Sequence, residues 1–254
     1  MTEDARILIK SPNNDYIVKI ADNQSELDQA FSLRYDVFNQ ELNSGLPQSS
    51  ATRKDQDNYD ALCEHLIVKH SSEDRVIGTY RILNRNVAKQ NFGFYSEQEF
   101  NLDQIYTIPE GVAEVGRSCV HQNYRGGTAI SLLWSGLAKY MKINSTRYLI
   151  GSGSIHSTDQ TVAEQIYAWL RDKNALSSNE LTIKPISSKS FSNFDLKANP
   201  PNTLAHVPPL IKGYLRLGAK YGGIPALDAE FGTTDFFVFF DYNQVNLKYG
   251  NHYK

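Results

Sequence analysis

The chain has 254 residues, 41% hydrophobic and 21% charged, with a formal net charge of −2 at pH 7. This composition is typical of a globular protein with one large or two small domains, and it excludes the global basic field of a nucleic-acid-binding protein. No apolar run approaches the roughly 18 residues of a membrane span, and the acidic start MTEDARILIK is unlike a secretory signal. We expect a cytoplasmic protein and leave a peripheral contact with the inner membrane open.

Cysteine and histidine usage bears on metal and redox chemistry. Cys63 and Cys119 lie far apart, and no two of the six histidines form an H-x-x-x-H pair. We therefore predict no disulfide framework, no metal site and no bound cofactor.

The chain begins with a strand and an amphipathic helix. Tyr16–Ile20 alternates apolar and polar residues, which predicts a strand. Gln24–Asn39 carries apolar residues at steps of four, which predicts a helix capped by Asn23 or Ser25.

A long polar stretch and a hairpin follow. Glu41–Asp60 is rich in Gly, Ser and Asp, and loops of this length are usually functional or disordered. Leu62–His70 and Arg75–Leu83 read as two strands of a hairpin, and Tyr95–Leu102 as a short helix.

The segment Val112–Trp134 combines three kinds of local structure. It opens with small and β-branched residues, which predict a buried strand, and it ends with apolar residues at helical spacing. Between them lies the polar turn Gln122–Thr128, which holds two glycines and an arginine. A strand, a glycine turn and a helix N-terminus together favour phosphate binding, because free amides point outward there.

The second half continues the alternation. Thr146–Ile150 is a predicted strand that ends in a Gly-Ser turn, Gly151–Ser154, and Thr158–Asp172 is a helix capped by Ser157 or Thr158.

Three further elements complete the pattern. Leu181–Ile186 is a predicted strand, and Ser187–Asn202 a loop. A helix begins at Pro208-Pro209 and runs to about Tyr221, where two glycines stop it. Asp235–Phe240 is an apolar strand covered on both faces. The order predicts an α/β fold with a mixed sheet.

The order of elements, with a phosphate-type turn after the fourth strand, resembles the GNAT (acyl-CoA N-acyltransferase) fold. The resemblance implies a mixed, splayed central sheet flanked by helices, in a single domain over residues 1–254 with a C-terminal extension from about 187. The turn of that family is Arg-x-x-Gly-x-Gly/Ala, whereas this chain has Thr128 and Ile130 in place of the two glycines. This departure argues against acetyl-CoA as the donor.

A closer resemblance is to acyl-homoserine-lactone synthases and the bacterial N-acyltransferases of ornithine-lipid synthesis. The synthase pattern is Arg-x-x-x-Phe, Asp-x-x-Asp, an Arg after a Gly, and Glu-x-x-Arg on the central strand. The chain matches it, in this order, with Arg34 and Phe38, Asp57 and Asp60, Gly78 and Arg81, Glu114 and Arg117. The tryptophan that follows the Phe in the synthases is missing here.

The C-terminal half is similar to the ornithine N-acyltransferases. The similar segments are Pro208–Ala219, then Asp228, Phe231 and Thr234-Asp235. The resemblance implies transfer of a 3-hydroxy fatty acyl group from acyl carrier protein to the α-amine of ornithine or a similar amino acid. The acyl-phosphopantetheine arm of the carrier is then the donor substrate, and the product is a lyso-aminolipid.

Glu114 and Arg117 are the catalytic candidates. Residues three apart on a regular strand face opposite sides, so a shared cleft requires a bulge, which Gly116 permits. Glu114 would accept a proton from the incoming ammonium, so that the free amine attacks the thioester directly. Arg117 would hold Glu114 or the substrate carboxylate. The alternative is a structural ion pair.

The polar turn is the candidate site for the donor's phosphate. Arg125 and the backbone amides of Gly126, Gly127, Thr128 and Ala129 would bind it, and Thr128 would also cap the helix. The alternative is a solvated turn.

Acidic residues of the long loop are candidates for binding the acceptor. Glu41, Asp57 and Asp60 suit an amine substrate, with a surface acidic loop as an equal alternative. Arg34 and Arg81 would tie this loop down as ion-pair partners. The remaining candidates for substrate binding are Phe38 and Ser118.

Lys212, Arg216 and Lys220 recur every four residues on the predicted helix from Pro208. This basic stripe would dock acidic acyl carrier protein or an anionic membrane surface, unless it is a solvated helix face. Two other functions stay open, namely an acyl-homoserine-lactone synthase and a non-catalytic, hemolysin-like binding protein.

Overall fold

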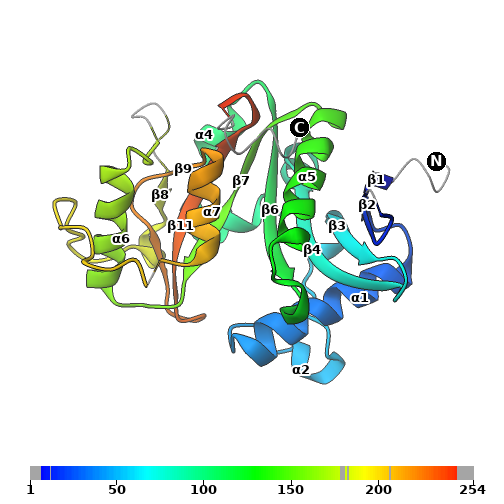
Figure 1. Cartoon of the computed structure of the whole chain (residues 1–254). Helices are drawn as coiled ribbons and strands as arrows, with labels where there is room; N and C mark the ends of the chain where they lie inside the picture. The colour runs from blue at the N-terminus through cyan, green and yellow to red at the C-terminus, as the bar shows by residue number, and fades with distance from the viewer. Residues whose placement is uncertain (1–6, 12, 178–180, 182, 206, 245–254) are drawn as a thin grey trace. The chain divides into compact units, whose positions relative to one another are not determined.

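The computed structural model describes residues 7–11, 13–177, 181, 183–205 and 207–244 (Figure 1). Within these residues the chain forms two compact units, which interleave along the sequence. The first comprises residues 7–92 and 115–146, and the second comprises 93–114 and 147–244. We describe each unit by itself.

The strands of the described chain, in sequence order, are β1 (Ile7–Lys10), β2 (Tyr16–Ile20), β3 (Glu64–His70), β4 (Arg75–Asn84), β5 (Phe100–Asn101), β6 (Gly111–Val120), β7 (Thr146–Ile155), β8 (Lys184–Pro185), β9 (Lys220–Tyr221), β10 (Ala226–Asp228) and β11 (Thr233–Asp241).

The α-helices are α1 (Gln24–Arg34), α2 (Ser49–Thr52), α3 (Arg85–Gln90), α4 (Asp103–Tyr106), α5 (Thr128–Ile143), α6 (Gln160–Asp172) and α7 (Pro209–Leu217). A π-helical segment, η2 (Tyr35–Glu41), follows α1 directly. The short 3-10 helices are η3 (Asp60–Leu62), η4 (Tyr95–Gln98), η5 (Gln122–Tyr124), η6 (Ser187–Lys189) and η7 (Tyr242–Gln244).

The main sheet has the strand order β1-β2-β3-β4-β6-β7-β11-β10, with β9 on β11. Strands β1 to β4 belong to the first unit and β7, β9, β10 and β11 essentially to the second, while β6 passes from the second unit to the first. Helix α5 joins the neighbouring strands β6 and β7, and a helical crossover of this kind is the connection that parallel strands need. The pairs β2–β3, β3–β4 and β7–β11 are antiparallel. The sheet is therefore mixed, as predicted.

Helices cover both faces of the sheet in the first unit. Ile67 of β3 packs with Ala30 and Leu33 of α1, whereas its neighbour Leu66 lies beside Gly136 of α5. Neighbouring residues of a strand face opposite sides, so α1 and α5 lie on opposite faces. A Cβ atom on Gly136 would lie 2.6 Å from a methyl group of Val18. Glycine therefore allows α5 to approach the sheet closely.

The second unit has a core of its own, in which α6 and α7 pack against β7 and β11. Phe236 and Val238 of β11 belong to this core, together with Trp169 and Ile211 from the two helices. Phe237 points to the other face and contacts Phe100, with ring centroids 5.5 Å apart. The predicted coverage of this strand on both faces is confirmed.

Helix α1 and the hairpin match the prediction, with one difference at the helix end. Asn23 caps α1 by accepting a hydrogen bond from the Glu26 N–H, as one of the two predicted caps. The regular α-helix ends at Arg34, and the predicted remainder to Asn39 lies in the π-helical segment. The predicted hairpin strands are β3 and β4.

Four predictions in the second half differ from the structure in detail. The Gly-Ser segment Gly151–Ser154 is not a turn, because β7 continues through it to Ile155. Helix α6 is capped by Asp159, whose side chain accepts from the Thr161 N–H. Helix α7 ends at Leu217, because Gly218 takes the left-handed conformation that terminates helices. The predicted strand at Leu181–Ile186 is reduced to β8 and includes residue 182, which lies outside the described residues.

Candidate active site

Glu114 is a buried carboxylate on the central strand β6, with 5% of its surface exposed. It accepts hydrogen bonds from the backbone N–H of Tyr95 (2.6 Å), the backbone N–H of Ser96 (2.8 Å) and the Ser96 hydroxyl (2.5 Å). All of these groups belong to the second unit. These three donors fix the orientation of the carboxylate.

Arg117, three residues further along β6, interrupts the regular strand. Its φ of +48° lies in the left-handed region, which a side chain other than glycine rarely adopts. The sequence predicted an irregularity at Gly116, and the left-handed residue is Arg117 itself. The Arg117 guanidinium lies over the Phe38 ring at 5.5 Å, and its Nε is 3.6 Å from Asp55 Oδ1. Within the first unit its facing carboxylate is therefore Asp55.

The first unit holds a buried network of arginines and aspartates. Arg34, which is fully buried, binds Asp60 through both terminal nitrogens at 2.7 and 3.1 Å and donates to Asp55 at 2.8 Å. Arg81 binds both oxygens of Asp57 at 2.7 and 2.8 Å. The predicted role of Arg34 and Arg81 as ion-pair partners of the loop is confirmed.

This network sets the charge state of Asp60. Burial opposes its ionisation, but the hydrogen bond and the charge of Arg34 prevail and lower the pKa of Asp60 to about 2. Asp60 is not part of an exposed acidic loop, because only 5% of its surface is accessible. Arginine nitrogens contact the carboxylate oxygens of Asp57 and Asp60. A role for these two aspartates in binding the acceptor stays a prediction.

Glu41 pairs with a different arginine, Arg125. It accepts a 2.6 Å hydrogen bond from Arg125, whose Nε also donates to the backbone carbonyl of Val120. Glu41 therefore neutralises the arginine that was predicted to bind the donor's phosphate. Ser118, another candidate, is half-buried on β6 next to Arg117.

The turn before α5 has the open backbone that an anion site requires. Gly127 is the N-cap residue at φ +101°, and a Cβ atom on Gly126 or Gly127 would meet nothing within 4 Å. The N-cap position is occupied by Gly127, which has no side chain, and Thr128 is already the first residue of the helix. The prediction that Thr128 caps the helix was therefore wrong. Among the described residues, the N–H groups of Gly126, Gly127, Thr128 and Ala129 donate no hydrogen bond. The positive end of a 16-residue helix is thus left open.

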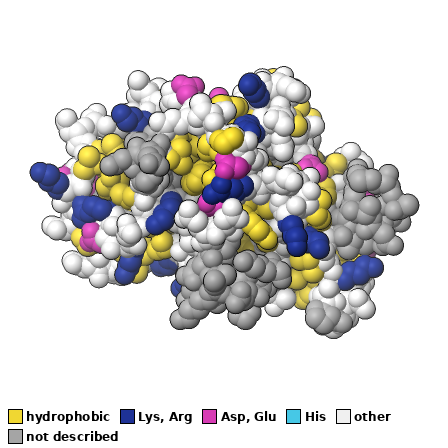
Figure 2. Space-filling view, turned by 90° about the horizontal axis from the view of Figure 1, so that it is seen from above, with side chains coloured by type: hydrophobic (Ala, Val, Ile, Leu, Met, Phe, Trp, Pro, Cys, Tyr) yellow, Lys and Arg dark blue, Asp and Glu magenta, His cyan; other side chains and the backbone are white. Residues whose placement is uncertain are grey.

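The predicted basic stripe is shorter than expected. Lys212 and Arg216 lie on α7, but Lys220 lies beyond its end in β9 and donates to the Asn174 carbonyl. Lys212 also donates to the Leu204 carbonyl. On the face seen in Figure 2, the Lys and Arg side chains lie singly, with other atoms between them.

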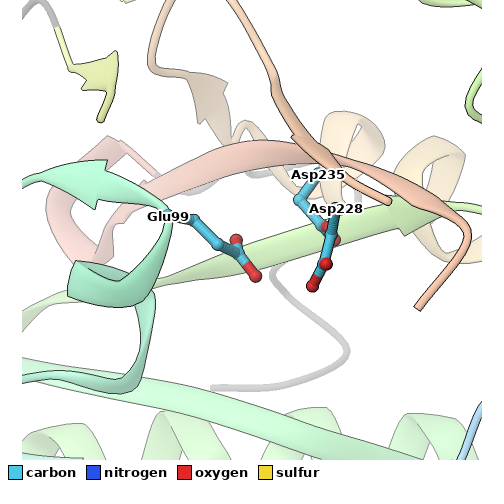
Figure 3. A group of neighbouring side chains, drawn as sticks. All are labelled: Glu99, Asp228 and Asp235. Carbon is cyan, nitrogen blue, oxygen red and sulfur yellow. The ribbon is translucent and has the colours of Figure 1, made fainter. Parts of the chain in front are cut away.

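Sequence reasoning missed a cluster of carboxylates in the second unit. Glu99, Asp228 and Asp235 are each at most 6% exposed, and one oxygen from each lies within 4.8 Å of the others. They come from the segment between η4 and β5, from β10 and from β11, and they point toward one another (Figure 3). Asp228 and Asp235 belong to segments similar to ornithine N-acyltransferases, which was the one signal available for them.

Two serine hydroxyls lie between this cluster and Glu114. The Ser96 hydroxyl, which bonds Glu114, lies 3.3 Å from the Ser152 hydroxyl, and Ser152 donates to Glu99 at 3.0 Å. Burial, followed by the charge of Asp235, raises the pKa of Glu99 to about 8. Burial likewise raises the pKa of Asp235. At neutral pH the Glu99 carboxyl is therefore mostly protonated, which limits the negative charge of the cluster.

A covalent acyl-enzyme has little support from the side chains near β6. Cys119 is buried, and burial raises the pKa of its thiol to about 12, so the thiolate nucleophile is scarce at neutral pH. The His121 ring contacts Arg75 at 2.8 Å, and burial together with that arginine lowers its pKa.

No helix of the described chain has the length and apolar character that crossing a membrane demands.

Comparison with known proteins identifies the fold and the family. Residues 33–135 match the family model described as an acetyltransferase (GNAT) domain. Among solved structures, FeeM, an N-acyl amino acid synthase from uncultured soil microbes, aligns with a TM-score of 0.52 at 13% identity over 91% of this chain and 96% of its own. TofI, crystallised in a ternary complex with an inhibitor and MTA, aligns with a TM-score of 0.52 at 14% identity over 93% and 96%. These likenesses confirm the predicted GNAT-like α/β fold.

Curated relatives extend over nearly the whole chain. The L-ornithine N(alpha)-acyltransferase of Rhizobium meliloti is 32% identical over 98% of this chain and 90% of its own length. The protein of the same name from Agrobacterium fabrum is 34% identical over 92% and 84%. That from Rhodobacter capsulatus is 32% identical over 94% of both chains. The chain is thus an acyltransferase and belongs to the family of L-ornithine N(alpha)-acyltransferases.

Proposed function

We propose that the protein transfers a 3-hydroxy fatty acyl group from acyl carrier protein to the α-amine of ornithine and so forms a lyso-ornithine lipid. The observation that carries this proposal is the name shared by relatives that match over 92% or more of the chain. A binding protein without turnover, an alternative at the level of sequence, is excluded because the family consists of acyltransferases.

Glu114 acts as the general base in this proposal. Its carboxylate takes one proton from the acceptor's α-ammonium, and the free amine then attacks the thioester carbonyl. The new C–N bond forms, the C–S bond breaks, and the second proton of the amine passes to the departing thiolate of the phosphopantetheine arm. Three hydrogen bonds from Tyr95 and Ser96 support this role, because they hold the carboxylate in one orientation.

The open turn before α5 is the proposed site for the phosphate of the donor's arm. The free N–H groups of Gly126 to Ala129 and the dipole of α5 support binding of an anion. Backbone amides require no particular side chain, which is consistent with Thr128 in place of a glycine. Arg125 would contribute its charge when it exchanges Glu41 for the phosphate.

The direct test is to incubate the protein with 3-hydroxyacyl carrier protein and a panel of amino acids, and to search for N-acyl products by mass spectrometry. The proposal predicts N-acyl-ornithine as the main product. A product with another amino acid and none with ornithine would correct the acceptor. Replacing the carrier-bound donor with acetyl-CoA tests the donor, and equal yields from both would contradict it.

A further inference from the structure

Arg117 is the member of the buried arginine–aspartate network of the first unit whose hydrogen bonds are incomplete. Arg34 and Arg81 donate to all three aspartates of the network, and the shortest distance to each is 2.7 or 2.8 Å. Arg117 faces Asp55, but its Nε lies 3.6 Å from Asp55 Oδ1, which is beyond hydrogen-bond distance. The aspartates are therefore held by the other two arginines, and Arg117 adds charge without a hydrogen bond.

Two nitrogens of the Arg117 side chain are buried donors without an acceptor. Nε and Nη2 are fully buried, and neither has a hydrogen-bond partner within the described residues. The Phe38 ring, 5.5 Å from the guanidinium carbon, offers a cation–π contact but no oxygen. Folded proteins provide acceptors for nearly all of their buried donors, so these two nitrogens indicate an acceptor that a ligand supplies.

Arg117 is also the most accessible of the three arginines in this network. Its side chain is 13% exposed, against 6% for Arg81 and 1% for Arg34. The left-handed φ of +48° at Arg117 breaks the regular alternation of β6, so its side chain does not take the direction that a regular strand would give it. A ligand that comes from solvent can therefore reach this guanidinium, whereas the other two stay covered.

The chemistry of a guanidinium defines the ligand that would complete it. Its planar pairs of N–H groups match the two oxygens of a carboxylate, and both partners are charged. We propose that Arg117 binds the α-carboxylate of the acceptor and thereby excludes amines that lack a carboxylate. This inference rests on the proposed function, in which the acceptor is ornithine and the other anionic group, the donor's phosphate, binds at the turn before α5.

The test compares ornithine with putrescine, which is ornithine without its carboxylate. The ratio of kcat/KM for ornithine to kcat/KM for putrescine is measured for the wild type, Arg117→Gln and Arg117→Lys. We expect Arg117→Gln to reduce the ratio by about tenfold to a hundredfold, through a higher KM for ornithine, and Arg117→Lys to reduce it less. Arg53→Gln is the matched control, because the Arg53 guanidinium also lies over a ring, that of Tyr35, but is exposed. The control should keep the wild-type ratio.

An unchanged ratio in folded Arg117→Gln overturns the inference. So does an equal loss of kcat/KM for both amines, because Arg117 would then serve only to pair with Asp55. Calorimetric titration separates failure of this inference from failure of the proposed function. A wild type that binds ornithine more tightly than putrescine, while Arg117→Gln does not, supports the inference even if no acyl product forms. A wild type without this preference, whether it binds both amines or neither, overturns it.

Discussion

Each unit brings three carboxylates together, but only the first unit supplies an equal number of arginines. Asp55, Asp57 and Asp60 face Arg34, Arg81 and Arg117 within the first unit. Glu99, Asp228 and Asp235 have one lysine between them in the second. The first set is balanced by arginines and stays ionised, whereas in the second set burial raises the pKa of Glu99 to about 8. The same residue types thus form an ionised network in one unit and a group with raised pKa values in the other.

We expect the largest effect from replacing Glu114, the proposed general base, because the proposed reaction cannot begin until the acceptor's ammonium loses a proton. We expect Glu114→Gln to reduce kcat by about a hundredfold to ten-thousandfold. The variant keeps one acceptor oxygen, which serves the N–H of either Tyr95 or Ser96 but not both, so its circular dichroism is compared with the wild type to show that it is folded. Glu110→Gln, just before β6, is the control. Near-normal turnover in Glu114→Gln would eliminate general-base catalysis by this residue.

Removal of a cation from the ionised network should destabilise the protein strongly. Arg34→Met leaves the buried Asp55 and Asp60 without their main partner, and breaking a buried pair costs about 3–5 kcal/mol. Urea unfolding followed by circular dichroism measures this loss, with Arg53→Met on the exposed surface as the control. An unchanged unfolding midpoint would mean that the network contributes nothing to stability.

Neutralising a carboxylate of the group with raised pKa values should have the opposite sign. Glu99→Gln relieves repulsion from Asp235 and Asp228, whose charges raise the pKa of Glu99, and the melting temperature at pH 8 should rise by a few degrees, corresponding to about 1 kcal/mol. A fall in melting temperature would show that the cluster stabilises the empty fold.

The pH dependence of stability separates the two clusters further. The folded pKa of Asp60 is about 2 against an ordinary 3.8, so its contribution is present above pH 3.8 and is lost as the pH falls toward 2. The folded pKa of Glu99 is about 8 against an ordinary 4.5, so its contribution is present below pH 4.5 and is lost as the pH rises through 8. Melting curves from pH 5 to 9 should therefore show a decline in the wild type that Glu99→Gln reduces. Identical slopes in both proteins would contradict this assignment.

The smallest effect is expected for the two basic residues that remain on α7. If they dock acyl carrier protein, the charge reversal Lys212→Glu with Arg216→Glu should raise the KM for the carrier-bound donor by a few-fold at low salt and less at high salt. Lys139→Glu with Lys142→Glu on α5 provides a matched control. Equal changes in both double variants would indicate a general charge effect rather than docking.

Sequence reasoning predicted the parts of the fold that depend on local patterns. Alternation identified β2, the turn between two strands identified β3 and β4, and a continuous apolar run identified β11, while helical spacing identified α1, α5 and α6. It failed where tertiary contacts override the local signal. The glycines of β7 look like a turn, yet Gly153 lies in a strand where Ile211 and Val238 leave little room for a larger side chain. Gly218 ended α7 before the pair of glycines that was expected to do so.

Some residues of the candidate site could be predicted from the sequence and others could not, because only some of them stand in a motif. Glu114, Arg117 and the arginine–aspartate pairs stand in motifs with fixed spacing, so resemblance found them. Glu99 carries no such signal, because it meets Asp228 and Asp235 only after β5, β10 and β11 have folded. A buried residue outside any motif can be assigned to a cluster only from the residues that surround it in the folded structure.

One competition assay tests the central claim of this account, the proposal that the protein transfers an acyl group from a carrier-bound donor to ornithine. Equal concentrations of ornithine and norvaline are mixed with the wild-type protein and 3-hydroxyacyl carrier protein, and both N-acyl products are quantified by mass spectrometry. The account predicts that N-acyl-ornithine exceeds N-acyl-norvaline by about tenfold or more. Equal amounts of the two products would contradict it.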